Sequence, residues 1–307
     1  MHACRVLCII FCLTPEGYSW GKVGHFISSK IALSFLTDDA EDFLYEMRAD
    51  GDRTLLESIM KSSIWPDSVS FTPAYSWSAD MHFGTTPDGK CDGFQLDRDC
   101  ASSKGGNSCT LTAIANYTEL ATDTSLPLKE QVEAVRFLIH FVADIHQPLH
   151  VGFKGDKGGT LIRVVPPWDF PYDKFGRIVS SPRVESLHFL WDSHILSYIM
   201  QRDGLSWEGL AKRSLSILNK DPNNAVNPML TGVTPIEHFG HIANESSDLA
   251  CRFAYTIHGR SVVSGMYLSW EYYEKAATVV MKQLTKSGIE IARLLNTIAQ
   301  NRVSRIV

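Results

Sequence analysis

Apolar residues recur every three or four positions along most of the chain, the spacing that gives a helix one hydrophobic face. The clearest example is residues 128–147, where Val135 and Val142 lie on the apolar side. Ser125 is the expected N-cap of this helix, and Pro148 should end it. The same periodicity predicts further helices over residues 24–36, 187–200, 249–257 and 272–300.

Alternating patterns typical of strands are confined to residues 160–165 and 176–181. They flank a tip rich in proline and aromatic residues, 166–175, which indicates one irregular β-hairpin. No linker rich in Pro, Gly or Ser, no charge block and no repeat divides the sequence. We therefore expect a mainly α fold, a single-domain helical bundle with one hairpin.

The first residues have a different pattern. A short basic segment is followed by the apolar run VLCIIFCL, and the small residues Gly17 and Ser19 precede Trp20. Eight apolar residues cannot span a bilayer, which needs roughly 20, so residues 1–19 are predicted to be a secretory signal peptide. Because no later run is long enough to span, we expect residues 20–307 to be secreted or lumenal, without stable membrane insertion.

The cysteines agree with an oxidising compartment. Three of the seven leave with the signal peptide, and the remaining four are Cys91, Cys100, Cys109 and Cys251. An even number predicts two disulfides with three possible connectivities. Asn116-Tyr-Thr and Asn244-Glu-Ser are candidate glycosylation sites.

The charge of the chain limits how it can bind a phosphate ester. It has 34 acidic and 29 basic side chains, a net charge of −5. Proteins that hold nucleic acid with basic side chains alone usually have the opposite balance. A phosphate ligand would therefore need positive charge from another source, such as bound metal ions.

Histidines and aspartates are concentrated in two apolar stretches. His140 and Asp144 are four residues apart, and so are His188 and Asp192, so each pair shares one helix face. His150 follows Pro148, where the chain should turn back. Imidazole and carboxylate on adjacent turns commonly hold zinc. One such pair is more often an ordinary buried hydrogen bond, but two pairs together with His150 favour a metal site.

Other candidate ligands lie nearer the N-terminus: Asp67 in IWPDSV, His82 fifteen residues later, and His25 five residues after Trp20. His146 and His194 fall off the two helix faces. We expect them to make structural hydrogen bonds rather than to bind metal.

Taken together, these motifs resemble a known family. The order WGxxGH, WPDSV, HF…TPD, NYT, HFVADIHQPLH, a GG turn and LHFLWD resembles the S1/P1 nucleases, from Trp20 to about residue 298. Members are zinc-dependent nucleases and 3′-nucleotidases that prefer single strands. The resemblance implies three Zn²⁺ ions with these ligands: Asp67, His82 and His140 for the first; the amine and carbonyl of Trp20, His25 and the shared Asp144 for the second; His150, His188 and Asp192 for the third.

The resemblance also implies a mechanism. A water between the two close zinc ions would be acidified and attack phosphorus in line, with Asp67 as the catalytic residue that orients or deprotonates it. The third zinc would stabilise the leaving 3′-oxygen, giving 5′-phosphorylated fragments, or nucleoside and phosphate from a 3′-nucleotide. Phe83 would stack on a base, the alternative being plain core packing. The implied disulfides are Cys91–Cys251 and Cys100–Cys109, and Asn116 matches a family glycosylation position.

The substrate pocket departs from the family. Ser70, Thr85 and Thr160 stand where members usually carry Arg, Asp and Asn. Ser70 removes a cation that clamps the phosphate, and Lys154 or Lys157, near the ligand turn, could replace it. The departures put base preference and rate in doubt while the ligands are intact.

Two alternatives remain open at this point. A zinc phospholipase C shares the fold and the trinuclear site, and the aromatic segment 166–175 would suit it; Asp192 and the short WGKVGH motif favour the nuclease. A secreted zinc-binding relative without turnover is the other alternative. Single-stranded nucleic acid and 3′-nucleotides are the expected substrates, and no obligate protein partner is expected.

Overall fold

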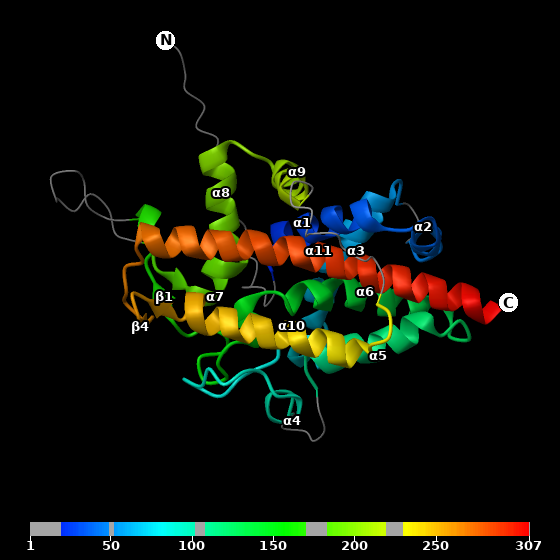
Figure 1. Ribbon diagram of the computed structural model, residues 1–307, viewed down its shortest axis with the longest axis horizontal. Helices are drawn as coiled ribbons and strands as arrows, with labels where there is room; N and C mark the ends of the chain where they lie inside the picture. Colours follow the sequence, from blue (N-terminus) through cyan, green and yellow to red (C-terminus); the bar gives the residue numbers. More distant parts are fainter. Residues whose placement is uncertain (1–19, 49–51, 102–107, 170–182, 219–229, 307) are drawn as a thin grey trace, which may run out of the picture.

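The structure, a computed structural model, describes residues 20–48, 52–101, 108–169, 183–218 and 230–306 (Figure 1). The predicted signal peptide and the predicted strand 176–181 lie outside these residues. Helices dominate the described part of the chain, so the mainly α prediction is confirmed. No helix in this part is both long and apolar enough to cross a membrane.

The helical elements fall into three kinds. The α-helices are α1 (Lys22–Ala32), α2 (Asp38–Glu46), α3 (Leu55–Ser70), α4 (Leu96–Asp99), α5 (Thr110–Thr122), α6 (Leu128–Asp144), α7 (Leu187–Phe189), α8 (Ile195–Asp203), α9 (Trp207–Leu218), α10 (Pro235–Leu249) and α11 (Trp270–Ile306). The 3₁₀ helices are η1 (Leu33–Phe35), η2 (Ser76–His82), η3 (Pro148–Val151) and η4 (Pro167–Asp169), and the π-helical turns are η5 (Leu190–His194) and η7 (Ala250–Ala254).

Helix α6 forms the centre of the bundle. It packs against α5, α3 and α11, and every residue from Phe137 to Asp144 is buried. A helix buried all round must be apolar on every face or must satisfy its polar groups internally.

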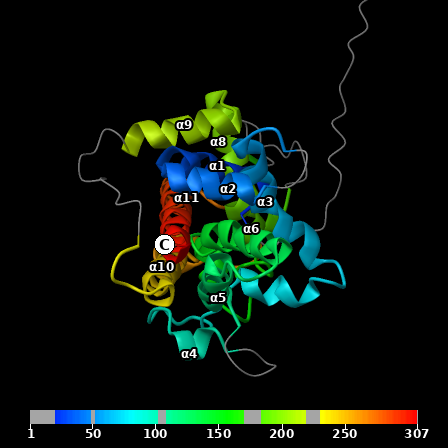
Figure 2. The same ribbon diagram turned by 90° about the vertical axis from the view of Figure 1, so that its right-hand side faces the viewer.

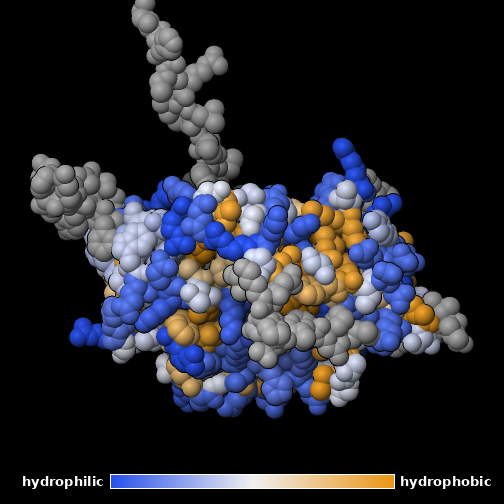
Figure 3. Space-filling model, turned by 45° about the horizontal axis from the view of Figure 1, so that its top comes forward, coloured by the Kyte–Doolittle hydropathy of each residue, from blue (hydrophilic) through white to orange (hydrophobic). Residues whose placement is uncertain are grey.

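Viewed along the bundle, α6 and α11 lie near the middle, with α8 and α9 on one side and α4 on the other (Figure 2). The surface is largely hydrophilic on the face shown in Figure 3.

The start of α6 differs from the prediction. The helix begins at Leu128 after Pro127, and Ser125 is not its cap. Instead, the backbone N–H and the hydroxyl of Ser125 both donate to Asp123 Oδ1, at 2.9 and 2.7 Å. These two hydrogen bonds to an aspartate two residues earlier hold Ser125 in a local turn. The helix ends at Asp144, and Pro148 is the first residue of η3.

Two short hairpins occur in the described residues, one more than predicted. Strand β1 (Arg163–Val164) pairs antiparallel with β2 (Glu185–Ser186), so only part of the predicted strand 160–165 is a strand. Strands β3 (Thr256–Ile257) and β4 (Arg260–Ser261) form the second hairpin.

The second hairpin corrects the helix predicted over 249–257, because helical structure stops at Ala254. His258 and Gly259, which link its strands, have φ values of 49° and 72°. Two left-handed residues give a tight turn whose twist matches paired strands.

The two disulfides connect Cys91 with Cys251 and Cys100 with Cys109. The connectivity implied by the resemblance is therefore confirmed. The first ties the segment before α4 to η7, across 160 residues of sequence. The second joins two cysteines that are nine residues apart in the sequence. Thr110, which follows Cys109, donates its N–H to the Phe83 carbonyl at 3.0 Å.

Candidate metal centre

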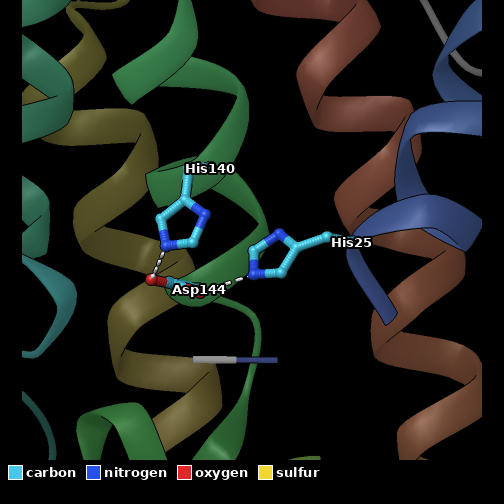
Figure 4. Close-up of side chains that lie close together, drawn as sticks. All are labelled: His25, His140 and Asp144. Atoms are coloured by element: carbon cyan, nitrogen blue, oxygen red, sulfur yellow. Dashed lines mark ion pairs between the residues drawn. The ribbon is translucent and has the colours of Figure 1, made fainter. Parts of the chain in front are cut away.

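Asp144 lies between two imidazoles (Figure 4). On α6, His140 Nε2 lies 3.0 Å from Asp144 Oδ2; from α1, His25 Nε2 lies 3.4 Å from Asp144 Oδ1. All three side chains are fully buried, and the two rings stack with centroids 4.2 Å apart. Each carboxylate oxygen therefore faces a different histidine. This is the geometry expected of a carboxylate that bridges two ligand groups.

Asp67 and His82 complete a group with His140. His140 Nε2 lies 2.9 Å from His82 Nδ1 and 3.5 Å from Asp67 Oδ1, and His82 Nδ1 lies 3.7 Å from Asp67 Oδ1. Ligands of a tetrahedral zinc with bonds of 2.0–2.1 Å are about 3.3 Å apart, so this spacing fits one small cation. The Asp67 side chain is 25 % exposed, whereas His82 and His140 are buried. Asp67 is thus the ligand of this group that solvent reaches.

His150, His188 and Asp192 form a third group. His188 Nε2 lies 3.1 Å from Asp192 Oδ2, and His150 Nε2 lies 3.6 Å from Asp192 Oδ1. The two imidazoles stack at 5.1 Å, and all three side chains are buried. Each of the three groups, taken over the described residues, could hold a metal ion. Eight of the nine predicted ligands, all except Trp20, therefore lie in these three groups.

Hydrogen bonds to the backbone set the tautomers of three histidines. Their Nδ1 atoms face carbonyl oxygens: His140 faces Ser63 (2.6 Å), His150 faces His82 (2.9 Å) and His188 faces Gly158 (2.7 Å). A carbonyl can only accept, so each Nδ1 carries a proton and Nε2 is the ring nitrogen left to face its group. Histidines that ligate metals typically have this arrangement. Although burial opposes protonation, the carboxylates beside them raise the pKa of His140 and His188, so metal binding would displace a proton from each Nε2.

Several buried atoms make no hydrogen bond within the described part of the chain. They include His150 Nε2, His188 Nε2 and Asp192 Oδ2. A buried polar atom without a partner costs about 1–3 kcal/mol, and three of them converge in one group. A divalent cation would satisfy all three. The donor set of imidazole nitrogen and carboxylate oxygen suits zinc.

The carboxylates are held in their charged forms. Burial acts to raise the pKa of Asp67, but His140 and His82 beside it outweigh burial and lower that pKa to about 2. Burial likewise opposes ionisation of Asp144, and the nearby His140 and His150 hold its pKa well below the usual value. Because metals bind deprotonated ligands, both aspartates are in the form that a cation requires.

Trp20 is completely buried beside these groups. Its indole Nε1 donates to Ala143 O at 2.9 Å, next to Asp144. The following Gly21 donates its N–H to Asp192 O at 3.0 Å. A side chain at Gly21 would meet the Ser193 hydroxyl, which would have to move, so residue 21 lies close against η5. Residue 20 thus lies beside the residues next to Asp144 and Asp192, and ligation by its amine stays a prediction.

Phe83 adjoins the third group. Its ring centroid lies 4.9 Å from that of His150 and 6.0 Å from that of His188, and the side chain is half-buried. It is not among the side chains that pack on the apolar core. The ring therefore lies beside His150 and His188, and its role in base stacking stays a prediction.

Of the three departures, Ser70 is bonded through its side chain and Thr85 and Thr160 through their backbone, and Thr160 Oγ1 is buried without a hydrogen bond in the described residues. Ser70 Oγ donates to Asp67 O at 2.9 Å, and Thr85 N and Thr160 N donate to the carbonyls of Asp99 and Lys157, each at 3.2 Å. Lys157 is exposed and left-handed, with φ of 54°, and immediately precedes Gly158, which supports His188. Lys154 is also exposed. A phosphate contact by either lysine stays a prediction.

His146 and His194 lie outside the three groups. His146 Nδ1 donates to Val142 O at 2.7 Å, and His194 pairs with Glu185. Both therefore have structural partners, as expected.

Sequence reasoning missed the groups that orient the ligands. The carbonyls of Ser63 and Gly158 leave no signature in a sequence, because every residue has one. Gln147 donates to Asp192 from within the motif HFVADIHQPLH, where its position between two ligands was the available signal.

Comparisons with known proteins agree with this site. A family model described as S1/P1 Nuclease matches residues 20–300. Endonuclease 3 of Arabidopsis thaliana is 31% identical over 299 residues, covering 93% of this chain and 92% of its own length. Nuclease P1 of Penicillium citrinum is 26% identical over 294 residues (93% and 100%), and Nuclease S1 of Aspergillus oryzae is 27% identical over 293 residues (92% and 92%). The chain therefore belongs to the S1/P1 nuclease family.

Proposed function

We propose that this protein is a secreted, zinc-dependent nuclease that cleaves single-stranded DNA and RNA to 5′-phosphorylated products and also acts as a 3′-nucleotidase. The observation that carries the proposal is the set of three His/Asp groups in a member of a nuclease family. Two of the groups share His140, and Asp144 Oδ2 lies 3.0 Å from both His140 and His82. Such a centre supplies the positive charge that an acidic chain otherwise lacks.

Nine residues would hold three Zn²⁺ ions: Trp20, His25, Asp67, His82, His140, Asp144, His150, His188 and Asp192. When bound, the ions would lower the pKa of a water molecule and offset the charge that develops on the phosphate. Asp67 has the role of catalytic residue in this scheme. Its carboxylate is ionised and reaches solvent, so it can accept a hydrogen bond from the attacking water and orient it.

Phe83 accounts for the preference for single strands. Its ring lies against the imidazoles of the third group, so a base stacked on it brings the adjoining phosphate to the ligands. A base must leave its duplex to stack there, which costs least when the strand is unpaired. Lys157, one residue from the carbonyl that supports His188, is the proposed phosphate contact.

Secretion follows from the N-terminal pattern and the disulfides. Residues 1–19 have the pattern of a signal peptide, and two disulfides suit an oxidising compartment. Asn116 on α5 and Asn244 on α10 are both exposed and would be the glycosylation sites. We do not propose an obligate protein partner.

The experiment that tests this function is a substrate panel. The mature protein, tagged at its C-terminus, is incubated with heat-denatured DNA, RNA, 3′-AMP and phosphatidylcholine, with and without chelator. We expect chelator-sensitive cleavage of both nucleic acids, with 5′-phosphate ends, and release of phosphate from 3′-AMP. Release of phosphocholine alone would favour the phospholipase C alternative. Zinc binding without turnover of any substrate would favour the non-catalytic one.

A further inference from the structure

Gln147 joins the centre of the bundle to the third group. It lies in the turn between α6 and η3, three residues after Asp144 and three before His150, and its side chain is completely buried. The backbone of the same residue accepts a hydrogen bond from His150 N at 3.0 Å and donates to Asp144 O at 2.9 Å.

Both ends of the Gln147 side chain make hydrogen bonds. Oε1 accepts from Leu149 N at 2.5 Å, and Nε2 donates to Asp192 Oδ1 at 2.6 Å. A peptide N–H can only donate, so the amide oxygen must face Leu149. The NH₂ group must therefore face the carboxylate, and the amide cannot be reversed.

This contact makes the two oxygens of Asp192 unequal. Oδ1 is occupied by the Gln147 amide. Oδ2 is buried, makes no hydrogen bond within the described residues and lies 3.1 Å from His188 Nε2. Oδ1, which also lies 3.6 Å from His150 Nε2, is thus hydrogen-bonded to Gln147, while Oδ2 is left without a hydrogen bond beside His188.

We propose that Gln147 is a positioning residue for the third metal-binding group. Its amide occupies Oδ1 of the Asp192 carboxylate and so leaves Oδ2 as the oxygen for a divalent cation, and it couples the turn that carries His150 to the π-helical turn that carries Asp192. The inference rests on the proposed function to the extent that the third group must bind a metal ion. It assigns Gln147 no contact with substrate.

Gln131, on α6, provides a matched control. It is also buried, its Nε2 donates to Leu126 O at 2.6 Å, and its Oε1 accepts from Arg302 at 2.8 Å. Gln147→Met and Gln131→Met each remove a buried side-chain amide of the same size, the first from the turn after α6 and the second from α6 itself. Only the first touches a ligand of the metal centre.

The test is a zinc titration. Wild type and both variants are loaded with zinc and dialysed against graded chelator concentrations, and the zinc per chain is counted by elemental analysis. Loss of an orienting contact typically weakens metal binding 10–100-fold. We expect Gln147→Met to release one of three ions at a chelator concentration at least about tenfold lower than wild type does, while Gln131→Met behaves as wild type.

Equal release from Gln147→Met and wild type, or equal loss from both variants, would overturn the inference. If Gln147→Met does not fold, Gln147→Asn decides by the same titration, since it keeps an amide that is too short to bridge Leu149 and Asp192. Wild type that binds three zinc ions but cleaves nothing would overturn the proposed function and leave this inference standing. Wild type that binds no zinc would overturn both.

Discussion

The two groups that share His140 and meet at Asp144 differ from the third group in the structure on which they are built. The first two take their ligands from α1, α3, η2 and α6, and Asp144 lies in the fully buried stretch of α6. The third takes His150 from a 3₁₀ turn and Asp192 from a π-helical turn. Regular helices fix side-chain direction through their own backbone bonds. The Asp192 carboxylate on its π-helical turn receives a side-chain hydrogen bond from Gln147, whereas His188 and His140, both on α-helices, face the backbone carbonyls of Gly158 and Ser63.

The largest effect on zinc content and cleavage rate is expected from replacing the carboxylates Asp144 and Asp192. Asp144→Asn removes the ligand shared by two groups, whereas Asp192→Asn affects only the third. We expect Asp144→Asn to retain one zinc ion and Asp192→Asn to retain two. Cleavage of denatured DNA should fall at least 10²–10³-fold in Asp144→Asn, roughly the cost of losing one preorganised electrostatic contact. Equal zinc counts in the two variants would show that Asp144 is not shared.

The i, i+4 spacing alone predicted one His/Asp pair in the groups around Asp144 and one in the third group. His140 with Asp144 and His188 with Asp192 could be paired from sequence because a helix places them on one face. Asp67, His82 and His25 have no such spacing, and only the family resemblance joined them to His140. A π-helical turn at Asp192 could not be anticipated, since its pattern of apolar residues also fits an α-helix.

Local chemistry produced the errors. Serine is a common N-cap residue, but the N–H and the hydroxyl of Ser125 both donate to Asp123, so Ser125 does not cap α6. The apolar residues at 249–257 fit a helix or a strand equally well, and the left-handed pair His258 and Gly259 makes its end a hairpin. Neither choice can be made from hydrophobic periodicity.

The next effect concerns the N-terminus. If Trp20 ligates through its amine, an added residue turns that amine into an amide, a poor ligand, at a position with no exposed surface. Protein with an extra Met before Trp20 should bind two zinc ions and lose at least about 100-fold in cleavage rate. Correctly processed protein with a C-terminal tag is the control. Equal zinc content and activity in the two forms would exclude Trp20 as a ligand.

A moderate effect is expected at Ser70, where the family's cation is missing. A charge placed on the transition-state phosphate is worth roughly 2–4 kcal/mol, so Ser70→Arg should raise kcat/KM for 3′-AMP at least about tenfold. Ser68→Arg adds the same charge at an exposed neighbouring position and should leave the rate unchanged. If Ser70→Arg is no faster than wild type, Lys154→Ala and Lys157→Ala would show whether a lysine already has this role.

The smallest effect is a difference in local stability after metal removal. A bound ion at 100 times its Kd stabilises its site by about 2.7 kcal/mol. Chelation should therefore speed amide hydrogen exchange more in η3 and η5, which are single irregular turns, than in the middle of α6. Similar changes in all three elements would mean that the third group is as rigid as the others without its ion.

The central claim is that the protein holds three metal ions, two of them on opposite sides of Asp144. Anomalous X-ray scattering from zinc-loaded crystals, measured on both sides of the zinc absorption edge, tests it directly. We predict three zinc peaks: two flanking the Asp144 carboxylate and one between His150, His188 and Asp192. A single peak near Asp144, or no peak in the third group, would contradict the account.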